Sequence, residues 1–312
     1  MTWVARVLAV VAAALVWLAA STTVTTAGTP PSPVLLARYA PLVVLHPAEL
    51  FSPVTVDGFL ADSDLEQSTA VGWEKVEGPL PAGGAALRLD QRDCEAIDGV
   101  AAAQCYADSQ AATPESPTVY GAVRRVQSRI VLEYWLWYPY DDYSPTVPAG
   151  EIWQVHEGDW EAISVVLDLG GRPLYAGYSE HGKGKRREWG SVPKRGSHPF
   201  VYVALGSHAN YFRPGEILLD PRVVEPALIS IIAAQGVRPV EHAGGGRLLR
   251  PAVVPITAVS PSWMTFAGTW GETGYVHVPN NAPIAAGTGP RGPASHGLWR
   301  SPVKTLLGWP KG

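Results

Sequence analysis

The sequence predicts a mainly β fold, an antiparallel β-sandwich or jelly-roll-like domain with a few peripheral helices. Short segments rich in β-branched and aromatic residues recur from residue 118 onward, each bounded by turn residues. Glycine (32) and proline (29) are abundant, as expected where many short strands are joined by turns. No internal repeat or coiled-coil heptad is visible, and 312 residues are enough for one large domain of this kind.

Residues 1–27 resemble a secretory signal peptide. Arg6 is the only charge, Val7–Ala20 is apolar, and Thr25-Thr26-Ala27 supplies small residues for cleavage. An uncleaved anchor is the alternative, but the apolar run is shorter than the roughly 20 residues that span a bilayer. Cleavage would remove one positive charge and change the formal net charge from −4 to −5.

A linker at residues 28–33 and a single β-sandwich domain at residues 34–312 are expected to follow. The first elements of the domain are a turn or helix, a strand ended by His46-Pro47, and a helix with an N-cap and first-turn proline at Ser52-Pro53. They are predicted at Val34–Tyr39, Leu42–Leu45 and 52–60. Residues 78–118 are rich in glycine, alanine and proline and are predicted to be mostly loop.

Strand patterns dominate the middle of the chain. Strands are predicted at Thr118–Val126, Arg129–Tyr138, Trp160–Leu169, Pro173–Ser179, Phe200–Leu205 and Glu216–Leu219. Pro221–Ala234 is the best later helix, and residues 279–297 are expected to be extended. This order of short strands with few helices is what predicts the sandwich.

Cys94 and Cys105 are the only cysteines. In an exported chain, such a pair is expected to form one structural disulfide. Acidic neighbours such as Asp93 and Glu95 argue against a reactive thiolate, and the lack of a C-x-x-C motif argues against a metal site at these cysteines.

Composition excludes several classes of function. The chain is 46% hydrophobic and 17% charged, with a formal net charge of −4, so it has no global basic field to recruit nucleic acid. Nothing resembles a nucleophile elbow, a P-loop or a dinucleotide-binding fingerprint. The sequence does not predict an oligomeric state.

The segment His156-Glu-Gly-Asp159-Trp-Glu161 is the strongest functional motif. Apolar strand-like sequence follows it, and alternation along a strand places Asp159 and Glu161 on one face. Two adjacent carboxylates repel each other, and a cation between them would remove that cost. The motif therefore predicts a metal site or a general acid/base pair.

Asp141 ends the aromatic segment that precedes this motif, with Asp142 beside it. If the two strands pair, Asp141 could reach His156, Asp159 and Glu161. Three carboxylates and one imidazole suit Mg²⁺, Ca²⁺ or Mn²⁺ better than a structural zinc. The alternative is that these aspartates only shape a turn, which is the preferred interpretation for Asp142.

Two histidines follow predicted strands, at the rim of the expected site. His181 precedes a glycine and could ligate a metal, contact a ligand or transfer protons; His208 could contact a ligand or pack in the core. Basic residues cluster after His181 and could hold a phosphate, sulfate or lipid headgroup, although a solvated surface is the ordinary use of such a run. The candidates for ligand binding are Lys183, Lys185, Arg186 and Arg187.

Several motifs together resemble the vacuolar protein sorting-associated protein 62 family. They are Tyr39-Ala-Pro41, His46-Pro-Ala-Glu49, Trp137-Tyr-Pro139, the His156–Glu161 motif, Ser179-Glu-His181-Gly, His198-Pro-Phe-Val-Tyr202 and Gly206-Ser-His208-Ala. The resemblance covers roughly residues 34–215, and a weaker part, with Phe266-Ala-Gly-Thr-Trp270-Gly and Gly289-Pro-Arg-Gly-Pro293, extends it to about Trp299.

More distantly, the centre of the chain is similar to the necrosis- and ethylene-inducing-like secreted cytolysins. That resemblance implies a β-sandwich, action on sphingolipid headgroups, and a divalent metal around a G-H-R-H-D-W-E heptapeptide. It assigns metal ligation to Asp141, His156, Asp159 and Glu161, and a functional histidine to His181. Val155, Glu157 and Gly158 depart from the heptapeptide, so cytolytic specificity does not follow.

Three functions remain open from the sequence. The first is a secreted or cell-envelope protein that uses a divalent metal to bind a glycan or lipid headgroup, with membrane activity as an option. The second is a metal-dependent hydrolase or lyase on the same cleft, with His181 as the catalytic residue. The third is a cell-envelope structural protein stabilised by a metal.

Overall fold

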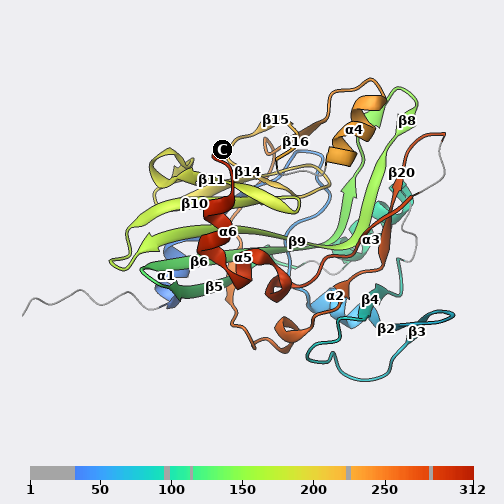
Figure 1. Cartoon of the computed structure of the whole chain (residues 1–312), viewed down its shortest axis with the longest axis horizontal. Helices are drawn as coiled ribbons and strands as arrows, with labels where there is room; N and C mark the ends of the chain where they lie inside the picture. The colour runs from blue at the N-terminus through green and yellow to red at the C-terminus, as the bar shows by residue number, and fades with distance from the viewer. Residues whose placement is uncertain (1–31, 95–98, 113–114, 223–225, 281–283) are drawn as a thin grey trace, which may run out of the picture.

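The computed structural model describes residues 32–94, 99–112, 115–222, 226–280 and 284–312 (Figure 1). The predicted signal segment, residues 1–27, lies outside the described residues, as does most of the predicted linker. Within the described residues the helices are α1 (Ser32–Tyr39), α2 (Asp57–Asp62), α3 (Gly99–Ala112), α4 (Pro226–Ala234), α5 (Gly297–Arg300) and α6 (Pro302–Gly308), with short 3-10 turns at Trp189–Ser191, Ser262–Thr265 and Pro293–Ser295.

An eight-stranded sheet forms the centre of the molecule, in the order β11-β10-β9-β6-β5-β18, with β20 and β21 attached through β9. Its strands are β5 (Thr118–Val126), β6 (Arg129–Tyr143), β9 (Trp153–Asp168), β10 (Pro173–Glu180), β11 (Lys183–Glu188), β18 (Ala252–Pro255), β20 (Thr273–His277) and β21 (Ile284–Thr288). The long antiparallel pair β6 and β9 lies at its middle.

A five-stranded sheet faces it. Its order is β12-β13-β1-β17, with β14 beside β13, and its strands are β1 (Leu42–Val44), β12 (Lys194–Arg195), β13 (His198–Val203), β14 (Asn210–Tyr211) and β17 (Leu248–Leu249). One core fills the space between the two sheets, with Tyr138 and Val165 from the large sheet against Val43 and Val201 from the small one. The predicted sandwich is therefore confirmed as a mainly β fold with peripheral helices.

The other face of the eight-stranded sheet is also covered. Trp135 and Trp160 pack there against Leu298 of α5 and Leu306 of α6, the helices that cross the sheet in Figure 1. A four-stranded sheet extends this layer: β2 (Ser63–Thr69), β3 (Gly72–Lys75), β4 (Leu87–Gln91) and β19 (Thr269–Trp270). Because both faces are covered, the side chains of β6 and β9 are almost continuously buried instead of alternating between buried and exposed.

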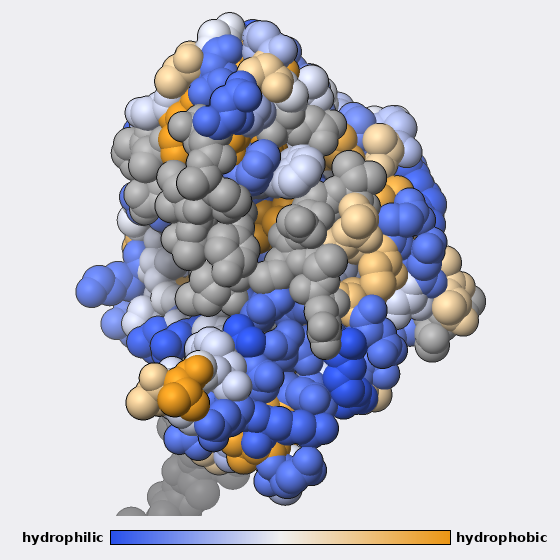
Figure 2. All heavy atoms as spheres, turned by 90° about the vertical axis from the view of Figure 1, so that its right-hand side faces the viewer, coloured by the Kyte–Doolittle hydropathy of each residue, from blue (hydrophilic) through white to orange (hydrophobic). Residues whose placement is uncertain are grey.

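Two small antiparallel pairs complete the fold, β7 (Thr146–Val147) with β8 (Gly150–Glu151) and β15 (Gly215–Leu218) with β16 (Val240–Ala243). The pairs β1–β13, β5–β18 and β4–β19 are parallel, so the sheets are mixed where the sequence predicts antiparallel pairing throughout. Figure 2 looks onto the end that carries β8 and the β2–β3 hairpin, and hydrophilic side chains predominate over its lower half. None of the described helices is long and apolar enough to cross a membrane.

The helix predicted at residues 52–60 is wrong at its start, because long-range contacts decide the backbone there. Residues 52–55 are not helical, and α2 begins at Asp57. The Ser52 N–H donates to Oε1 of Gln110 (3.1 Å) and the Val54 N–H donates to the Trp137 carbonyl (3.1 Å). These bonds hold the segment extended, so the N-cap pattern at Ser52 is not used.

The segment predicted to be mostly loop, residues 78–118, contains β4 and the long helix α3. Alanine has the highest helix propensity, and α3 is rich in it. The predicted disulfide is present between Cys94 and Cys105, with a Cα–Cα distance of 5.7 Å, and it joins α3 to the segment that follows β4.

Both central strands are longer than predicted, and this places the functional residues differently. β6 continues through Pro139 to Tyr143, and β9 begins at Trp153. Asp141 and His156 therefore lie opposite each other within paired strands, where a turn was expected after Pro139.

Candidate metal centre

The β6–β9 pairing brings the predicted carboxylates to one end of the inter-sheet core. Asp141 lies opposite His156, Tyr138 opposite Asp159 and Leu136 opposite Glu161. Asp159 and Glu161 are both buried, two residues apart on one strand. Alternation thus places both carboxylates on the face that packs against the five-stranded sheet.

Three side chains meet most closely at this end of the core. Asp141, Asp159 and His208, called the histidine group below, each offer a ligand atom, and these atoms lie within 4.8 Å of one another. His208 comes from the turn between β13 and β14, with a positive φ of 51°. A non-glycine residue in this backbone region is uncommon, which marks His208 as a specifically positioned side chain.

His208 is clamped between two carboxylates. Its Nδ1 lies 3.0 Å from Oδ2 of Asp159 and its Nε2 lies 3.4 Å from Oε1 of Glu49. Its ring stacks on Tyr138 with centroids 3.8 Å apart. Burial lowers the pKa of His208, but Glu49 and Asp159 together raise it to about 10. His208 is therefore an imidazolium that fixes Asp159, and a metal would be held by the carboxylates.

His156 stands on the other side of Asp141. Its Nε2 lies 3.7 Å from Oδ2 of Asp141, and its Nδ1 lies 2.8 Å from the Gly158 carbonyl. A neutral ring that donates Nδ1–H to that carbonyl keeps a lone pair on Nε2, which is the usual arrangement of a metal-ligating histidine. Burial raises the pKa of Asp141 to about 7, with His156 lowering it and Asp159 raising it.

Glu161 lies next to this group but is engaged by other side chains. The Ser179 hydroxyl donates to Oε2 of Glu161, and Nδ2 of Asn210 lies 3.4 Å from the same oxygen. Burial, followed by the charge of Asp159, raises the pKa of Glu161 well above its usual range. Glu161 therefore lies beside the histidine group, but Ser179 and Asn210 hold its carboxylate.

His181 forms a second carboxylate–histidine pair. It also has a positive φ, 55°, and its Nε2 lies 3.2 Å from Oε1 of Glu241. Glu241 also accepts from the hydroxyls of Ser207 and Tyr211. Burial lowers the pKa of His181, but Glu241 raises it to about 9. His181 is therefore a proton donor at neutral pH.

The predicted basic loop is a strand, β11, and its cations contact the chain itself. Lys185 Nζ lies 3.0 Å from Oε2 of Glu180, and Lys183 Nζ donates to the Arg222 carbonyl (3.1 Å). The Arg186 guanidinium lies 3.7 Å from Glu188, and that of Arg187 covers the ring of Phe212. These contacts hold the basic side chains along the sheet edge.

Glu49 and Glu241 were not among the predicted site residues. Glu49 follows β1 and lies in the His46-Pro-Ala-Glu49 motif, which was the available signal. Glu241 lies on β16, where no element was predicted, and its side chain is fully buried. A buried carboxylate needs a partner, but only the fold shows that each partner is a histidine.

The departures from the heptapeptide have a steric explanation. Gly158 has a φ of +60°, and a Cβ there would lie 2.4 Å from both Trp137 Cη2 and the Trp270 carbonyl oxygen. Glu157 points away from the histidine group, where its carboxylate accepts from the Tyr106 hydroxyl and from the Glu272 N–H (3.2 Å). A side chain at residue 158 would therefore collide with Trp137 and Trp270.

Comparison with family models identifies the family. The model of vacuolar protein sorting-associated protein 62 matches residues 29–281, most of the chain. The chain belongs to the vacuolar protein sorting-associated protein 62 family. The sequence motifs predicted this membership, and the match extends beyond residue 215, where the stronger motifs end. No curated protein matches the chain.

Solved structures similar to this member of the family belong to distant proteins. NLPPya in complex with glucosamine is 14% identical, with a TM-score of 0.34, and the likeness covers 72% of this chain and 73% of that chain. Necrosis and Ethylene inducing Protein 2 from the causal agent of cocoa's Witches Broom disease is 17% identical, with a TM-score of 0.32, covering 72% and 75%. The non-toxic HaNLP3 protein is 14% identical, with a TM-score of 0.33, covering 74% and 80%.

Proposed function

We propose that this protein is an exported, divalent-metal-binding β-sandwich protein that binds the hydroxyl-rich headgroup of a glycan or lipid at a cell surface. The observation that carries the proposal is the histidine group, in which two buried carboxylates and one imidazole converge within 4.8 Å. The disulfide supports export, since such bonds persist in oxidising compartments.

The charge balance of the buried end supports a cation. Glu49, Asp141, Asp159 and Glu161 lie around one imidazolium, His208. Burial raises the pKa values of Asp141 and Glu161, so their ionised forms are costly at this place unless a further cation is present. A divalent cation bound there would favour the ionised forms.

Unpartnered polar atoms gather around the same place. Among the described residues, the hydroxyl of Tyr138 and Oδ1 of Asn210 are buried without a hydrogen-bond partner. Buried polar groups in native proteins almost always have partners, and water or an ion supplies those that the chain does not. These atoms are where a hydrated cation would be accommodated.

The ligand types favour Mg²⁺, Ca²⁺ or Mn²⁺. Asp141 and Asp159 supply carboxylate oxygens, His156 supplies one nitrogen, and Glu161 is close enough to join after a side-chain movement. Hard cations of this kind keep open positions that water or hydroxyl oxygens fill. Vicinal hydroxyls of a sugar would displace that water, and the protonated His181 would donate to a neighbouring oxygen.

Metal analysis of the mature domain tests this proposal. We expect about one Ca²⁺, Mg²⁺ or Mn²⁺ per wild-type chain, loss of metal in Asp159→Asn and Asp141→Asn, and loss of binding to glycan and lipid arrays in the same variants. Asp168→Asn is the control, because Asp168 lies on the same strand but pairs with Arg172 at its end. Equal metal content in all four proteins would exclude the site.

A hydrolase or lyase is the second candidate, favoured by the protonated His181 held by Glu241. A general acid must be protonated and positioned, and His181 is both. Turnover of a glycan or phospholipid that disappears in His181→Gln while metal content stays constant would establish this activity. A metal that raises the melting temperature but changes neither binding nor turnover would instead indicate a structural protein.

A further inference from the structure

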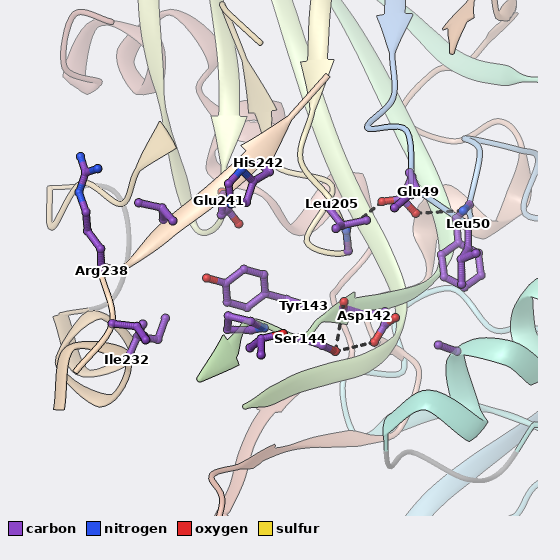
Figure 3. Close-up of a pocket in the computed structure, with 18 of the residues that line it drawn as sticks. Glu49, Leu50, Asp142, Tyr143, Ser144, Leu205, Ile232, Arg238, Glu241 and His242 are labelled. Carbon is purple, nitrogen blue, oxygen red and sulfur yellow. Dashed lines mark hydrogen bonds between the residues drawn. The ribbon is translucent and has the colours of Figure 1, made fainter. Parts of the chain in front are cut away.

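A cavity of about 520 Å³ is lined in part by Glu49 and Glu241, the carboxylates that pair with His208 and His181 (Figure 3). It lies between the end of β6, the loop after β1, helices α3 and α4, and strand β16. Its volume falls in the range of small-molecule sites, roughly 300–1,000 Å³. This cavity does not include the ligand atoms of the histidine group.

The walls of the cavity are largely apolar. They are formed by Ala48, Leu50, Phe51, Ala103, Pro145, Leu205, Ile232, Val237 and Val240. Leu50 is exposed at 51%, which is unusual for a leucine beside a cavity and places apolar surface at its opening. An apolar body of a ligand would be favoured here, because it removes this surface from water.

The two buried carboxylates of the lining are not available to a cation. Glu49 accepts from the N–H groups of Phe51 (2.9 Å) and Gly206 (2.8 Å) and lies against His208. Glu241 accepts from two hydroxyls and lies against His181. Each carboxylate is therefore engaged by a histidine and by hydrogen-bond donors, so neither is free to bind a ligand.

Two donors of the lining could meet a ligand headgroup; the carboxylate of Asp142 also lines the cavity, and its Oδ1 accepts from the Ser144 hydroxyl (2.8 Å). Arg238 lines the cavity, and its guanidinium lies 2.6 Å from Glu216 in an ion pair whose two side chains are 65% and 48% exposed. Such a pair contributes little to stability, so Arg238 can exchange its partner. Tyr143 lines the cavity as well; it is 5% exposed, and its hydroxyl has no hydrogen-bond partner among the described residues.

Both residues lie on the same side of the cavity. Figure 3 shows the Tyr143 ring extending toward the side where Ile232 and Arg238 lie, with Glu241 and His242 above it. Burial raises the pKa of the Tyr143 hydroxyl, so it remains a neutral donor. A buried donor without an acceptor is costly, and an acidic headgroup would supply the missing acceptor.

We propose that this cavity is a second ligand site, distinct from the metal centre, for a small amphiphile with an apolar body and one anionic headgroup. The body lies against Leu50, Ile232 and Val240, and the headgroup accepts from Arg238 and the Tyr143 hydroxyl. The site shares Glu49 and Glu241 with the metal centre but uses neither as a ligand.

Titration calorimetry with octanoate and with octanol tests the proposal on the full mature chain. The two probes have the same apolar body, and only octanoate carries a charge. We expect one octanoate to bind per chain and octanol to bind at least about tenfold more weakly, since charge-assisted hydrogen bonds are the stronger ones. Absence of saturable octanoate binding, or equal affinity for octanol, would overturn the proposal.

Variants locate the binding. Arg238→Glu should weaken octanoate binding about tenfold, and Tyr143→Phe several-fold, without lowering stability because the hydroxyl has no partner to lose. Val240→Trp fills the cavity and should abolish binding; Leu205→Trp serves if that variant does not fold. Arg172→Glu is the matched control, an exposed arginine paired with Asp168 away from the cavity. Unchanged binding in Arg238→Glu and Tyr143→Phe would refute the headgroup assignment.

One further variant separates this site from the metal centre. Asp159→Asn should lose metal and still bind octanoate with an affinity within about threefold of wild type. Loss of octanoate binding in that variant, with the fold intact, would show that the cavity is not a separate site.

Discussion

Two buried acidic groups lie on opposite sides of one strand, β9, and they are neutralised in different ways. The histidine group gathers Asp141 and Asp159 around His208. A second group, called the arginine group here, gathers Asp90, Glu157 and Glu272 on the side of the four-stranded sheet. Glu157 belongs to the arginine group and Asp159 to the histidine group, so the side chains of these two residues point to different sides of β9.

The difference lies in the cation that each group contains. Arg88 pairs with Asp90 (2.6 Å), Glu66 (2.7 Å) and Glu272 (3.6 Å). An arginine is always charged and its fork of donors saturates several carboxylate oxygens at once. Histidines offer fewer donors and a removable proton. In the arginine group Arg88 pairs with Asp90 and Glu272, and Glu157 accepts from the Tyr106 hydroxyl and the Glu272 N–H. The histidine group contains no arginine, and this difference supports the metal site that we propose there.

The largest expected effect is on the arginine group. Arg88→Met removes the cation that Glu66, Asp90 and Glu272 share in a largely buried place, so we expect the free energy of unfolding to fall by about 3–5 kcal/mol. Chemical denaturation measures it. Arg172→Met is the control, because that arginine is 86% exposed and its pair should contribute no more than about 1 kcal/mol. A similar small loss for both variants would mean that Arg88 does not neutralise the group.

A smaller effect is expected at the glycine between the groups. Gly158→Ala adds a methyl group 2.4 Å from Trp137 and from the Trp270 carbonyl, at a positive φ that alanine disfavours. We expect a loss of about 2–4 kcal/mol in thermal or chemical unfolding. Gly182→Ala, with open space around its Cβ, should cost far less. If Gly158→Ala were as stable as wild type, the close approach of Trp137 and Trp270 would not be what requires a glycine at this position of β9.

Glu133 sharpens the comparison, because it is a buried carboxylate with a single arginine at 3.4 Å. Burial raises its pKa from 4.5 to about 7, although Arg124 lowers it. Between these two values the folded state binds more protons than the unfolded state, so stability falls as pH rises through this range and is level above it. Glu133→Gln should remove this fall, gaining about 1–3 kcal/mol relative to wild type between pH 4 and pH 8.

Unfolding free energies measured at several pH values test this expectation. Glu74→Gln on the exposed strand β3 is the control and should follow the wild-type curve. A wild-type curve that stays parallel to that of Glu133→Gln would show that the arginine fully offsets the burial of Glu133.

The sequence predicted the bounds of a strand most accurately where the pattern of side chains along that strand is enough to define it. β5 has the predicted bounds, β10 ends one residue later than predicted, and β15 begins and ends one residue earlier. The helix at Ser52 failed because Gln110 and Trp137, far along the chain, supply the hydrogen bonds of that segment. The helix α3 was missed because the glycine, proline and cysteine around it resemble a loop, although its own residues favour a helix.

The sequence by itself determined the mainly β class, the disulfide, the family and the meeting of Asp141 with the His156–Glu161 motif, because strand alternation and short-range spacing are written into the order of residues. Only the tertiary structure decided that His208 clamps Asp159, that Glu49 and Glu241 hold the two histidines, and that Glu157 belongs to another group. Those contacts join residues 49 to 159 positions apart. Such pairs form only when the two sheets pack, since burial is what makes each carboxylate need its partner.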